Sequence, residues 1–406
     1  MKNNIYLQEA EANLEEIRRN RRFFHQYPEL GFQEFQTAER VAKHLKSLGL
    51  EVKTGIAGTG VVGVLRCHRP GRTAALRADM DAMPMEEKNP VPYASKNPGI
   101  MHSCGHDGHT AMLMETARLL VHHKDSLRGN VKFIFQPCED TIPSGAEPMI
   151  AEGVLNDPDV EAIFTVHLMS RFPEGSMWLK QGYMTISSAG FELTLQGRGG
   201  HVGAPHDVID PIMMAGMLIT GSQSMMSRRV APGQTMIFGF GTIHGGTADN
   251  IVPDEVTLTG SIRTATPEDR EAAIGDFERI VKGVVESVGG SYTLKVEIQN
   301  PSVYNDPELV PLVKNAGAEI LGETNVQEFS WIFPGGDDAA FFQQKVPGVY
   351  WYLGTRNEGK GFDKPHHNPY FDFDESMLAV GAAVQAQVVT EFLSARSSGR
   401  SGPDEC

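Results

Sequence analysis

Short β-rich runs constrain this chain most, because they alternate with helical patterns through its first half. The helical patterns cover residues 7–26, 35–48 and 110–123. Alternation of this kind is typical of a parallel or mixed α/β sheet. A later run, VPGVYWYL (346–353), predicts one more buried strand. The early runs are GVVGVLRC (60–67), TAALRAD (73–79), NVKFIFQP (130–137) and EAIFTVHL (161–168).

Residues 191–300 show a different pattern of predicted strands and helices. Its order is β-α-β-β-α-β, which is that of a ferredoxin-like unit. At 406 residues the chain exceeds what one hydrophobic core usually supports. We therefore predict an α/β fold of two domains, in which residues 187–300 are inserted into a catalytic domain with a mixed sheet. That catalytic domain would consist of residues 1–186 and 301–406.

Charge and composition exclude several classes of partner. The formal net charge of -15 would repel phosphate backbones and anionic lipid head groups. We therefore expect no nucleic acid partner. No stretch looks long enough to span a membrane, and the N-terminal segment lacks the apolar core of a signal peptide. The four cysteines are too few for a disulfide scaffold, which favours a reducing cytoplasm.

Potential metal ligands follow three of the predicted strands. Asp79 and Asp81 end the second run, Glu139 and Asp140 follow the third, and His167 lies at the end of the fourth. In open α/β sheets, ligands bind in the crevice beyond the carboxyl ends of the strands. The sequence therefore predicts that these side chains meet in one crevice.

Two further segments add ligands of the right kind. The loop HSCGHDGH (102–109) places Cys104 and His106 just before a helix, and the segment KPHHNPYFDFDE contains His366 and His367. Thiolate, imidazole and carboxylate together suit zinc, and the carboxylate share leaves manganese or cobalt open. We expect five other histidines to be structural or solvated: His25, His44, His68, His122 and His123.

Seven motifs, in order, resemble the metal-dependent aminoacylase and carboxypeptidase-type amidohydrolases. The resemblance covers nearly the whole chain and is greatest for the branch of bacterial hippurate hydrolases and plant auxin-conjugate hydrolases. The motifs are HQYPELGFQEFQT (25–37), RADMDAMP (77–84), HSCGHDGHTAML (102–113), FQPCED (135–140), GRGGHVGAPH (197–206), GGTADNIVPDEVTLTGSIRT (245–264) and HNPYFDFDE (367–375).

The resemblance implies two divalent metal ions and names their ligands. Glu139 matches the general base, and Asp81 resembles an acid that orients a metal-bound imidazole. The residues that match metal ligands are Cys104, His106, Asp140, His167 and His367, with the cysteine resembling a bridge between the two ions. Asp140 is a departure, because the family usually has a second glutamate there. GGDDAAFF (335–342) also replaces the usual SEDF motif.

The inserted domain resembles a lid that also mediates dimerisation. His201 matches a group that contacts the scissile carbonyl, and Asn250 and Arg263 match groups that contact the substrate carboxylate. In the family such groups often come from the neighbouring subunit, which implies a homodimer or a higher homo-oligomer.

The expected reaction is hydrolysis of the amide bond of an N-acyl amino acid or a related small conjugate. A metallo-dipeptidase or carboxypeptidase would use the same metals and remains an alternative. A non-catalytic protein that keeps the fold and a single metal is a third hypothesis, which is disfavoured because Glu139 and all five ligand positions are chemically competent. The acyl group and the preferred amino acid stay open.

Overall fold

The computed structural model describes residues 4–395 and divides into two compact units. Unit 1 contains the chain up to Gly182, then Tyr304–Ser330, then the chain from Phe341 onward. Unit 2 contains Tyr183–Val303 and Trp331–Ala340. The second of these segments was not expected from the sequence. It joins unit 2 through Phe333, whose N–H donates to the Met184 carbonyl and whose carbonyl accepts from Ile186.

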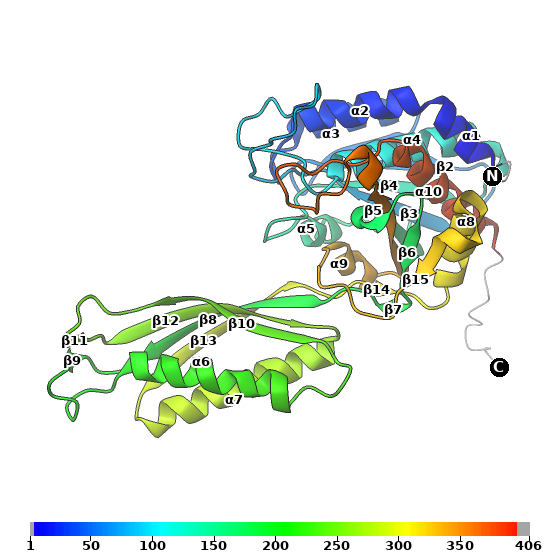
Figure 1. Cartoon of the computed structure of the whole chain (residues 1–406). Coiled ribbons are helices and arrows are strands. Elements are labelled where there is room, and N and C mark those ends of the chain that lie inside the picture. The colour runs from blue at the N-terminus through cyan, green and yellow to red at the C-terminus, as the bar shows by residue number, and fades with distance from the viewer. Residues whose placement is uncertain (1–3, 396–406) are drawn as a thin grey trace, which may run out of the picture. The chain divides into compact units, whose positions relative to one another are not determined.

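Unit 1 is built on an eight-stranded mixed sheet (Figure 1). The strand order is β1-β2-β4-β3-β5-β16-β6-β15, in which β3 pairs in parallel with both β4 and β5, and β16 pairs in parallel with β5. This is the predicted α/β architecture with a large mixed sheet. The strands are β1 (Glu51–Ile56), β2 (Gly60–Arg66), β3 (Thr73–Asp79), β4 (Asn130–Gln136), β5 (Ala162–Pro173), β6 (Met177–Leu179), β15 (Val326–Glu328) and β16 (Gly348–Arg356).

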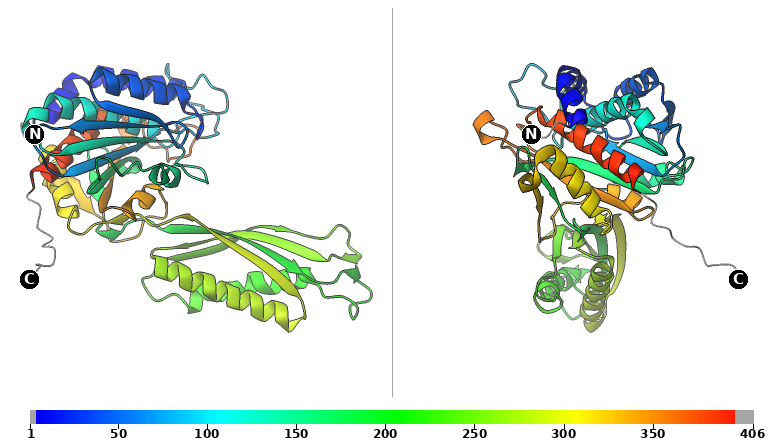
Figure 2. Two further views of the ribbon diagram at one scale, coloured as in Figure 1. Left: turned by 180° about the vertical axis from the view of Figure 1, so that it is seen from behind. Right: turned by 90° about the vertical axis from the view of Figure 1, so that its right-hand side faces the viewer.

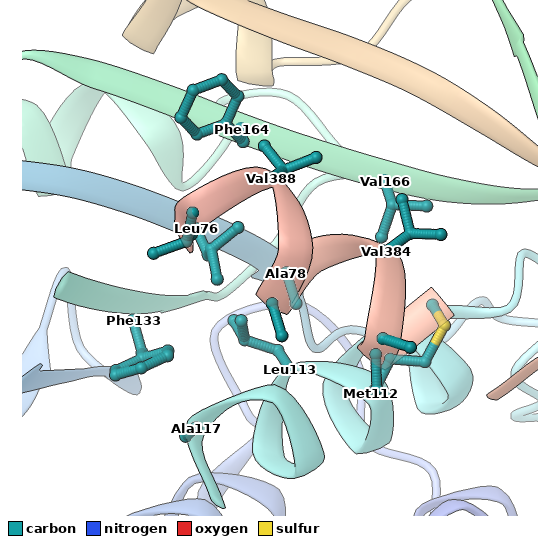
Figure 3. Close-up of a cluster of buried hydrophobic side chains, with 14 of the residues drawn as sticks. Leu76, Ala78, Met112, Leu113, Ala117, Phe133, Phe164, Val166, Val384 and Val388 are labelled. Atoms are coloured by element: carbon teal, nitrogen blue, oxygen red, sulfur yellow. The ribbon is translucent and has the colours of Figure 1, made fainter. Parts of the chain in front are cut away.

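Helices cover both faces of this sheet, so its central strands are apolar on both sides. On one face Leu76, Phe133 and Phe164 pack against the two helices α4 and α10 (Figure 3). On the other face Ala75 and Ile134 pack with α5 and Phe342 of α9. The helices are α1 (Ile5–Ala12), α2 (Leu14–Gln26), α3 (Phe35–Ser47), α4 (His106–His122), α5 (Ala146–Ala151), α8 (Val310–Leu321), α9 (Ala339–Gln343) and α10 (Met377–Ser394), with short 3₁₀ turns at Lys124–Ser126, Glu323–Asn325 and Glu358–Lys360.

Two expectations about helices need correction. The helix expected over residues 7–26 is two helices, because Asn13 leaves the helical conformation between α1 and α2. The expectation that no stretch could span a membrane is wrong for α10, which is long and apolar enough by length and composition alone. However, 72% of that window is buried inside the protein, where α10 packs on α1, α4 and α8. Its apolar composition is therefore that of a core helix.

Unit 2 contains a four-stranded antiparallel sheet with two helices on one face (Figures 1 and 2). The strand order is β10-β12-β8-β13. Leu193, Leu218 and Phe277 belong to its core, which is separate from the core of unit 1. The elements are β8 (Ser187–Gln196), α6 (Pro211–Arg228), β10 (Met236–His244), β12 (Glu255–Thr264), α7 (Pro267–Ser287) and β13 (Ser291–Asn300), with a short pair of β9 (Gly200–His201) to β11 (Ile251–Val252). A second short pair joins β7 (Gly182–Tyr183), at the boundary of the two units, to β14 (Tyr304–Asn305) of unit 1.

Candidate metal centre

The parallel strands β4, β3 and β5 are neighbours, so the segments that follow them meet at one edge of the sheet. Asp81 follows β3, Asp140 follows β4, and His167 lies on β5. Cys104 and His106 arrive from the turn before α4, where Gly105 has a φ of 90°. That left-handed conformation favours glycine and lets the chain turn sharply into the helix. All these residues belong to unit 1.

His367 reaches the same place from the end of the chain. Its N–H donates to the carbonyl of Ser103 at 2.9 Å, which joins its loop to the one that carries Cys104. His367 itself has a φ of 58°, an uncommon conformation for a side chain other than glycine. Its Nε2 lies 3.6 Å from Oδ1 of Asp140, and Nε2 of His167 lies 3.6 Å from Sγ of Cys104.

The two buried imidazoles present their Nε2 atoms to the cluster. Nδ1 of His106 lies 3.0 Å from the Asp81 carbonyl, and Nδ1 of His167 lies 2.5 Å from the Leu168 carbonyl. A carbonyl can only accept, so both Nδ1 atoms donate, and in the neutral form of each ring Nε2 keeps a lone pair. Burial, with the nearby His109 and His366, holds the pKa of His167 well below its usual range. The ring is therefore neutral, which is the form that binds metal.

The donor set fits a dinuclear metal centre. Cys104 belongs to two groups whose ligand atoms lie within 4.8 Å of one another, one with His106 and His167 and the other with Asp140 and His367. Among the described residues, Nε2 of His106 and Oδ2 of Asp140 are buried without a hydrogen-bond partner. Burial, followed by the charge of Asp140, raises the pKa of the Cys104 thiol to about 12. A thiolate here therefore needs a nearby cation.

Asp81 is hydrogen-bonded to two of the potential ligands. Its Oδ1 lies 3.2 Å from Nδ1 of His106, and its Oδ2 accepts the N–H of Asp140 at 3.1 Å. Each oxygen of Asp81 therefore contacts one of two potential ligands, His106 and Asp140. Partners of this kind fix the direction of a metal ligand.

Glu139 lies beside the cluster. Its side chain is 8% exposed, and its Oε2 lies 3.9 Å from Nε2 of His106. This places a carboxylate next to a potential metal ligand, where it could accept a proton from a water molecule held there.

Asp79 and His109 are also buried and lie next to His106, but both nitrogens of His109 already have hydrogen-bond partners. His109 accepts the N–H of Leu168 through Nε2 at 2.8 Å and donates to Asp79 through Nδ1 at 2.6 Å. The other oxygen of Asp79 accepts from Arg77 at 2.7 Å. These residues support the backbone next to His167. Residue type and spacing gave no signal that separated His109 from His106, and only the family resemblance selected His106.

The structure places the remaining predicted residues in unit 2. His201 and Asn250 lie together, because β9 pairs with β11 and the N–H of Val202 donates to the Asn250 carbonyl. Both side chains are exposed. Nδ1 of His201 accepts the N–H of Gly203 at 2.8 Å, so its Nε2 carries the proton and can donate.

Arg263 lies on β12 of the four-stranded sheet, at the end remote from the β9–β11 pair. It is paired with Ser188, where the chain enters β8, whereas the β9–β11 end of the sheet adjoins Glu255. Arg263 is eight positions beyond Glu255 along β12, which is roughly 25 Å at the rise of an extended strand. Within one chain, unit 2 therefore does not bring Arg263 to His201 and Asn250.

A buried ion-pair network behind the cluster was missed by sequence reasoning. The fully buried guanidinium of Arg21 on α2 donates to Asp107 at 2.7 Å and to Asp372 at 2.8 Å. Asp107 follows His106 on α4, and it also accepts from His25 at 2.8 Å. His25 is structural, as expected, but it belongs to the layer that holds the ligand-bearing segments.

Comparison with known proteins agrees with this geometry. Residues 75–391 match the family model described as "Peptidase family M20/M25/M40". The chain belongs to this family. It is 40% identical to thermostable carboxypeptidase 1 of Saccharolobus solfataricus, over 92% of this chain and 94% of that protein. It is 37% identical to N-acetylcysteine deacetylase of Bacillus subtilis, over 92% of this chain and 96% of that protein.

A solved structure extends the likeness to the three-dimensional fold. The crystal structure of a dinuclear metal-binding peptidase of this family from Bacillus subtilis aligns with a TM-score of 0.82 at 32% identity, covering 94% of this chain and 99% of that one. The family and the donor set together identify the chain as a metal-dependent hydrolase of amide bonds.

Proposed function

We propose that this family member hydrolyses N-acyl amino acids with two divalent metal ions bound by Cys104, His106, Asp140, His167 and His367. The observation that carries the proposal is the shared position of Cys104 in two groups of ligand atoms, beside buried polar atoms that lack another partner. Zinc, manganese and cobalt all suit this mixture of thiolate, imidazole and carboxylate.

Glu139 is the proposed general base. When bound, the ions would act as Lewis acids that lower the pKa of water and polarise the amide carbonyl. Glu139 removes the proton from the attacking water and delivers it to the nitrogen of the departing amino acid. Asp81 holds His106 and the Asp140 backbone in place during this exchange. His201 would donate a hydrogen bond from Nε2 to the carbonyl oxygen as negative charge develops there.

Arg263 is the proposed clamp for the carboxylate of the amino-acid half. Its guanidinium is exposed on a strand, and it matches a carboxylate in a bidentate way. Asn250, the other proposed carboxylate contact, lies with His201 at the far end of β12, roughly 25 Å away. A small amide cannot reach both ends. Arg263 and His201 of one chain would therefore serve two different active sites.

This separation supports a homodimer in which each lid completes its partner's site. We propose that unit 2 is the ferredoxin-like lid and dimerisation domain. Its strand β10 lies at an edge of the sheet and exposes Ile237 and Ile243. The neighbouring α6 exposes Ile212, Met213 and Met217. An open edge beside an apolar helix face favours symmetric pairing of two copies.

A reducing cytoplasm is the proposed location. Cys67, Cys104 and Cys138 are free thiols, whereas Cys406 lies outside the described residues. A protein that depends on the thiol of Cys104 for metal binding suits a compartment that keeps thiols reduced.

The substrate proposal is tested with pairs of amides. Wild type should hydrolyse an N-acyl amino acid faster than the same compound with its carboxylate converted to an amide. An Arg263→Ala variant should scarcely distinguish the two, because the clamp that reads the carboxylate is gone. Lys295→Ala, which removes another exposed cation of unit 2, is the matched control and should discriminate like wild type. Equal discrimination by all three proteins would assign the carboxylate to another residue.

A carboxypeptidase is the second candidate function, favoured by the 40% identity to a thermostable carboxypeptidase. Side-by-side hydrolysis of an N-acyl amino acid, the corresponding dipeptide and an N-blocked peptide separates the two functions. Preference for peptides would establish the second candidate. A non-catalytic binding protein predicts that no amide is cut whether metal is added or removed, whereas either hydrolase should lose activity on chelation and regain it with divalent metal.

A further inference from the structure

Glu34 is a fully buried carboxyl group, in the HQYPELGFQEFQT motif, to which the proposed mechanism gives no role. It immediately precedes α3. Its Oε1 accepts the backbone N–H of Cys138 at 2.9 Å, and its Oε2 accepts the hydroxyl of Thr59 at 2.5 Å. The motif therefore reaches from the N-terminal region of the chain to the turn that carries Glu139 and Asp140.

That turn has an unusual backbone. Cys138 has a φ of 50°, in the left-handed region that disfavours side chains other than glycine. Surrounding contacts must hold it there. The N–H of Cys138 is held by Glu34, its carbonyl accepts the N–H of Gly145 at 2.8 Å, and the N–H of Asp140 is held by Asp81. Glu139 thus lies between two residues whose amides are each bound by a buried carboxylate.

The same motif also packs directly on Cys138. A Cβ atom added to Gly31 would lie 2.5 Å from Sγ of Cys138 and 2.8 Å from its Cβ. Only glycine lets the loop approach this closely. Residues 31–34 therefore pack against the turn that carries Glu139, and Glu34 binds the backbone N–H of Cys138 in that turn.

The negative charge of Glu34 does not stabilise the folded protein. Burial, and then the charge of Asp81, raises the pKa of Glu34 to about 7. Its folded-state pKa is therefore above the value of an unfolded chain, so the group lowers stability progressively as the pH rises from about 4.5 to about 7. An amide side chain could accept the same N–H without that penalty.

We propose that Glu34 is a positioning residue for the catalytic base: by holding the Cys138 amide it fixes the left-handed turn and aims the carboxylate of Glu139. This rests on the proposed role of Glu139 as the base. Glu34 acts through the turn and touches neither substrate nor the reacting atoms.

The test compares Glu34→Gln with Glu34→Met in the metal-loaded, full-length enzyme. Glutamine keeps an oxygen that can accept the Cys138 N–H, so kcat should stay within about threefold of wild type. Methionine keeps the volume and removes the acceptor, so kcat should fall about tenfold or more while KM, metal content and the thermal unfolding midpoint change little. Thr59→Val removes only the second contact of Glu34 and should leave kcat within about threefold.

A double-mutant cycle with Glu139→Gln separates positioning from a general structural role. If Glu34 acts through Glu139, the Glu34→Met change should have little further effect on kcat once the base is gone. Multiplying effects, or equal losses from the glutamine and methionine variants, would overturn the proposal. If the methionine variant does not fold, Gly31→Ala, which displaces Cys138, replaces it in the same cycle with the same expected result. Near-normal turnover of Glu139→Gln alone would instead refute the proposed role of Glu139 as the base. The failure of the proposed function can therefore be told apart from the failure of the positioning role of Glu34.

Discussion

His106 and His109 lie on consecutive turns of α4, are both buried, and have opposite uses. Both nitrogens of His109 are hydrogen-bonded, one to Asp79 and the other to the N–H of Leu168. His106 uses only Nδ1 for a hydrogen bond, to the Asp81 carbonyl, and its Nε2 faces the cluster without a hydrogen-bond partner. At the scale of single residues, therefore, the identity of a ligand depends on which of its atoms already have partners, because a lone pair that accepts an N–H cannot also bind a metal ion.

The first prediction concerns the adjacent acids Glu139 and Asp140. Glu139→Gln removes the proposed base but no ligand, so metal content should persist while kcat falls about a hundredfold or more. Asp140→Asn is the contrasting variant, and it should lose metal because a carboxylate ligand is gone. Elemental analysis and steady-state kinetics on the same samples check both. Loss of metal from Glu139→Gln, or retention by Asp140→Asn, would reverse the two assignments.

At the scale of elements, one buried cation ties together the segments that carry the ligands. Arg21 on α2 binds Asp107 on α4 and also Asp372 and Glu375, which follow His367 in the chain. Breaking such a network leaves a buried charge unpaired, which is strongly destabilising. The relative position of the His106 and His367 segments therefore depends on an interaction with a third element.

His25 gives this network a testable dependence on pH. Burial and Arg21 lower the pKa of His25, but hydrogen bonds and charge from Asp107 and Glu87 outweigh them and raise it to about 9. A raised folded-state pKa contributes stability that is fully present below about pH 6.5 and is lost as the pH rises through about 9. The contribution is on the order of 3 kcal/mol.

Urea unfolding of wild type and His25→Gln at pH 6, 8 and 10 would measure this contribution. The difference between the two proteins should be largest at pH 6 and should shrink towards pH 10. His68→Gln, at an exposed histidine, is the matched control and should follow wild type at each pH. A difference between wild type and His25→Gln that stays constant with pH would show that His25 is not protonated in the folded protein.

At the scale of the whole molecule, unit 2 presents two sets of candidate substrate contacts beyond opposite ends of β12. His201 and Asn250 lie at the end that adjoins Glu255, and Arg263 lies at the end where the chain enters. If both sets serve amide hydrolysis, only one of them can act in the same chain as the metal ligands. The proposed dimer follows from this distance.

Mixed dimers test the sharing. Glu139→Ala and His201→Ala proteins, each nearly inactive, are refolded or expressed together so that chains exchange. If His201 acts on its partner, one site of a mixed dimer has both defects and the other has neither. Random mixing should then restore about a quarter of wild-type activity, since half of the dimers are mixed and half of their sites are intact.

Arg263→Ala provides the control, because the separation along β12 predicts that it behaves oppositely. Glu139→Ala mixed with Arg263→Ala should restore nothing if Arg263 serves its own chain. Mass spectrometry confirms that mixed dimers are present. Recovery of activity in both mixtures, or in neither, would contradict the proposal that His201 serves the partner's site and Arg263 serves its own.

The sequence by itself determined the local elements and the chemistry available to them. Strand runs that lead to Asp81, Asp140 and His167 predicted the sheet edge where ligands meet. A short apolar strand can be recognised from its own residues. The helix expected over residues 7–26 failed only at Asn13. The helix α10 was not predicted at all, because it is mostly buried and its apolar residues are not confined to one stripe that would mark its period.

Tertiary structure alone decided which of several equivalent side chains remain available. Nothing local distinguishes His106 from His109, and nothing in the HQYPELGFQEFQT motif indicates that Glu34 binds an amide 104 residues further along the chain. The sequence likewise gives no sign that residues 331–340 belong to unit 2, or that His201 and Arg263 lie far apart. These features depend on hydrogen bonds and packing between distant segments, which form only when the chain has folded.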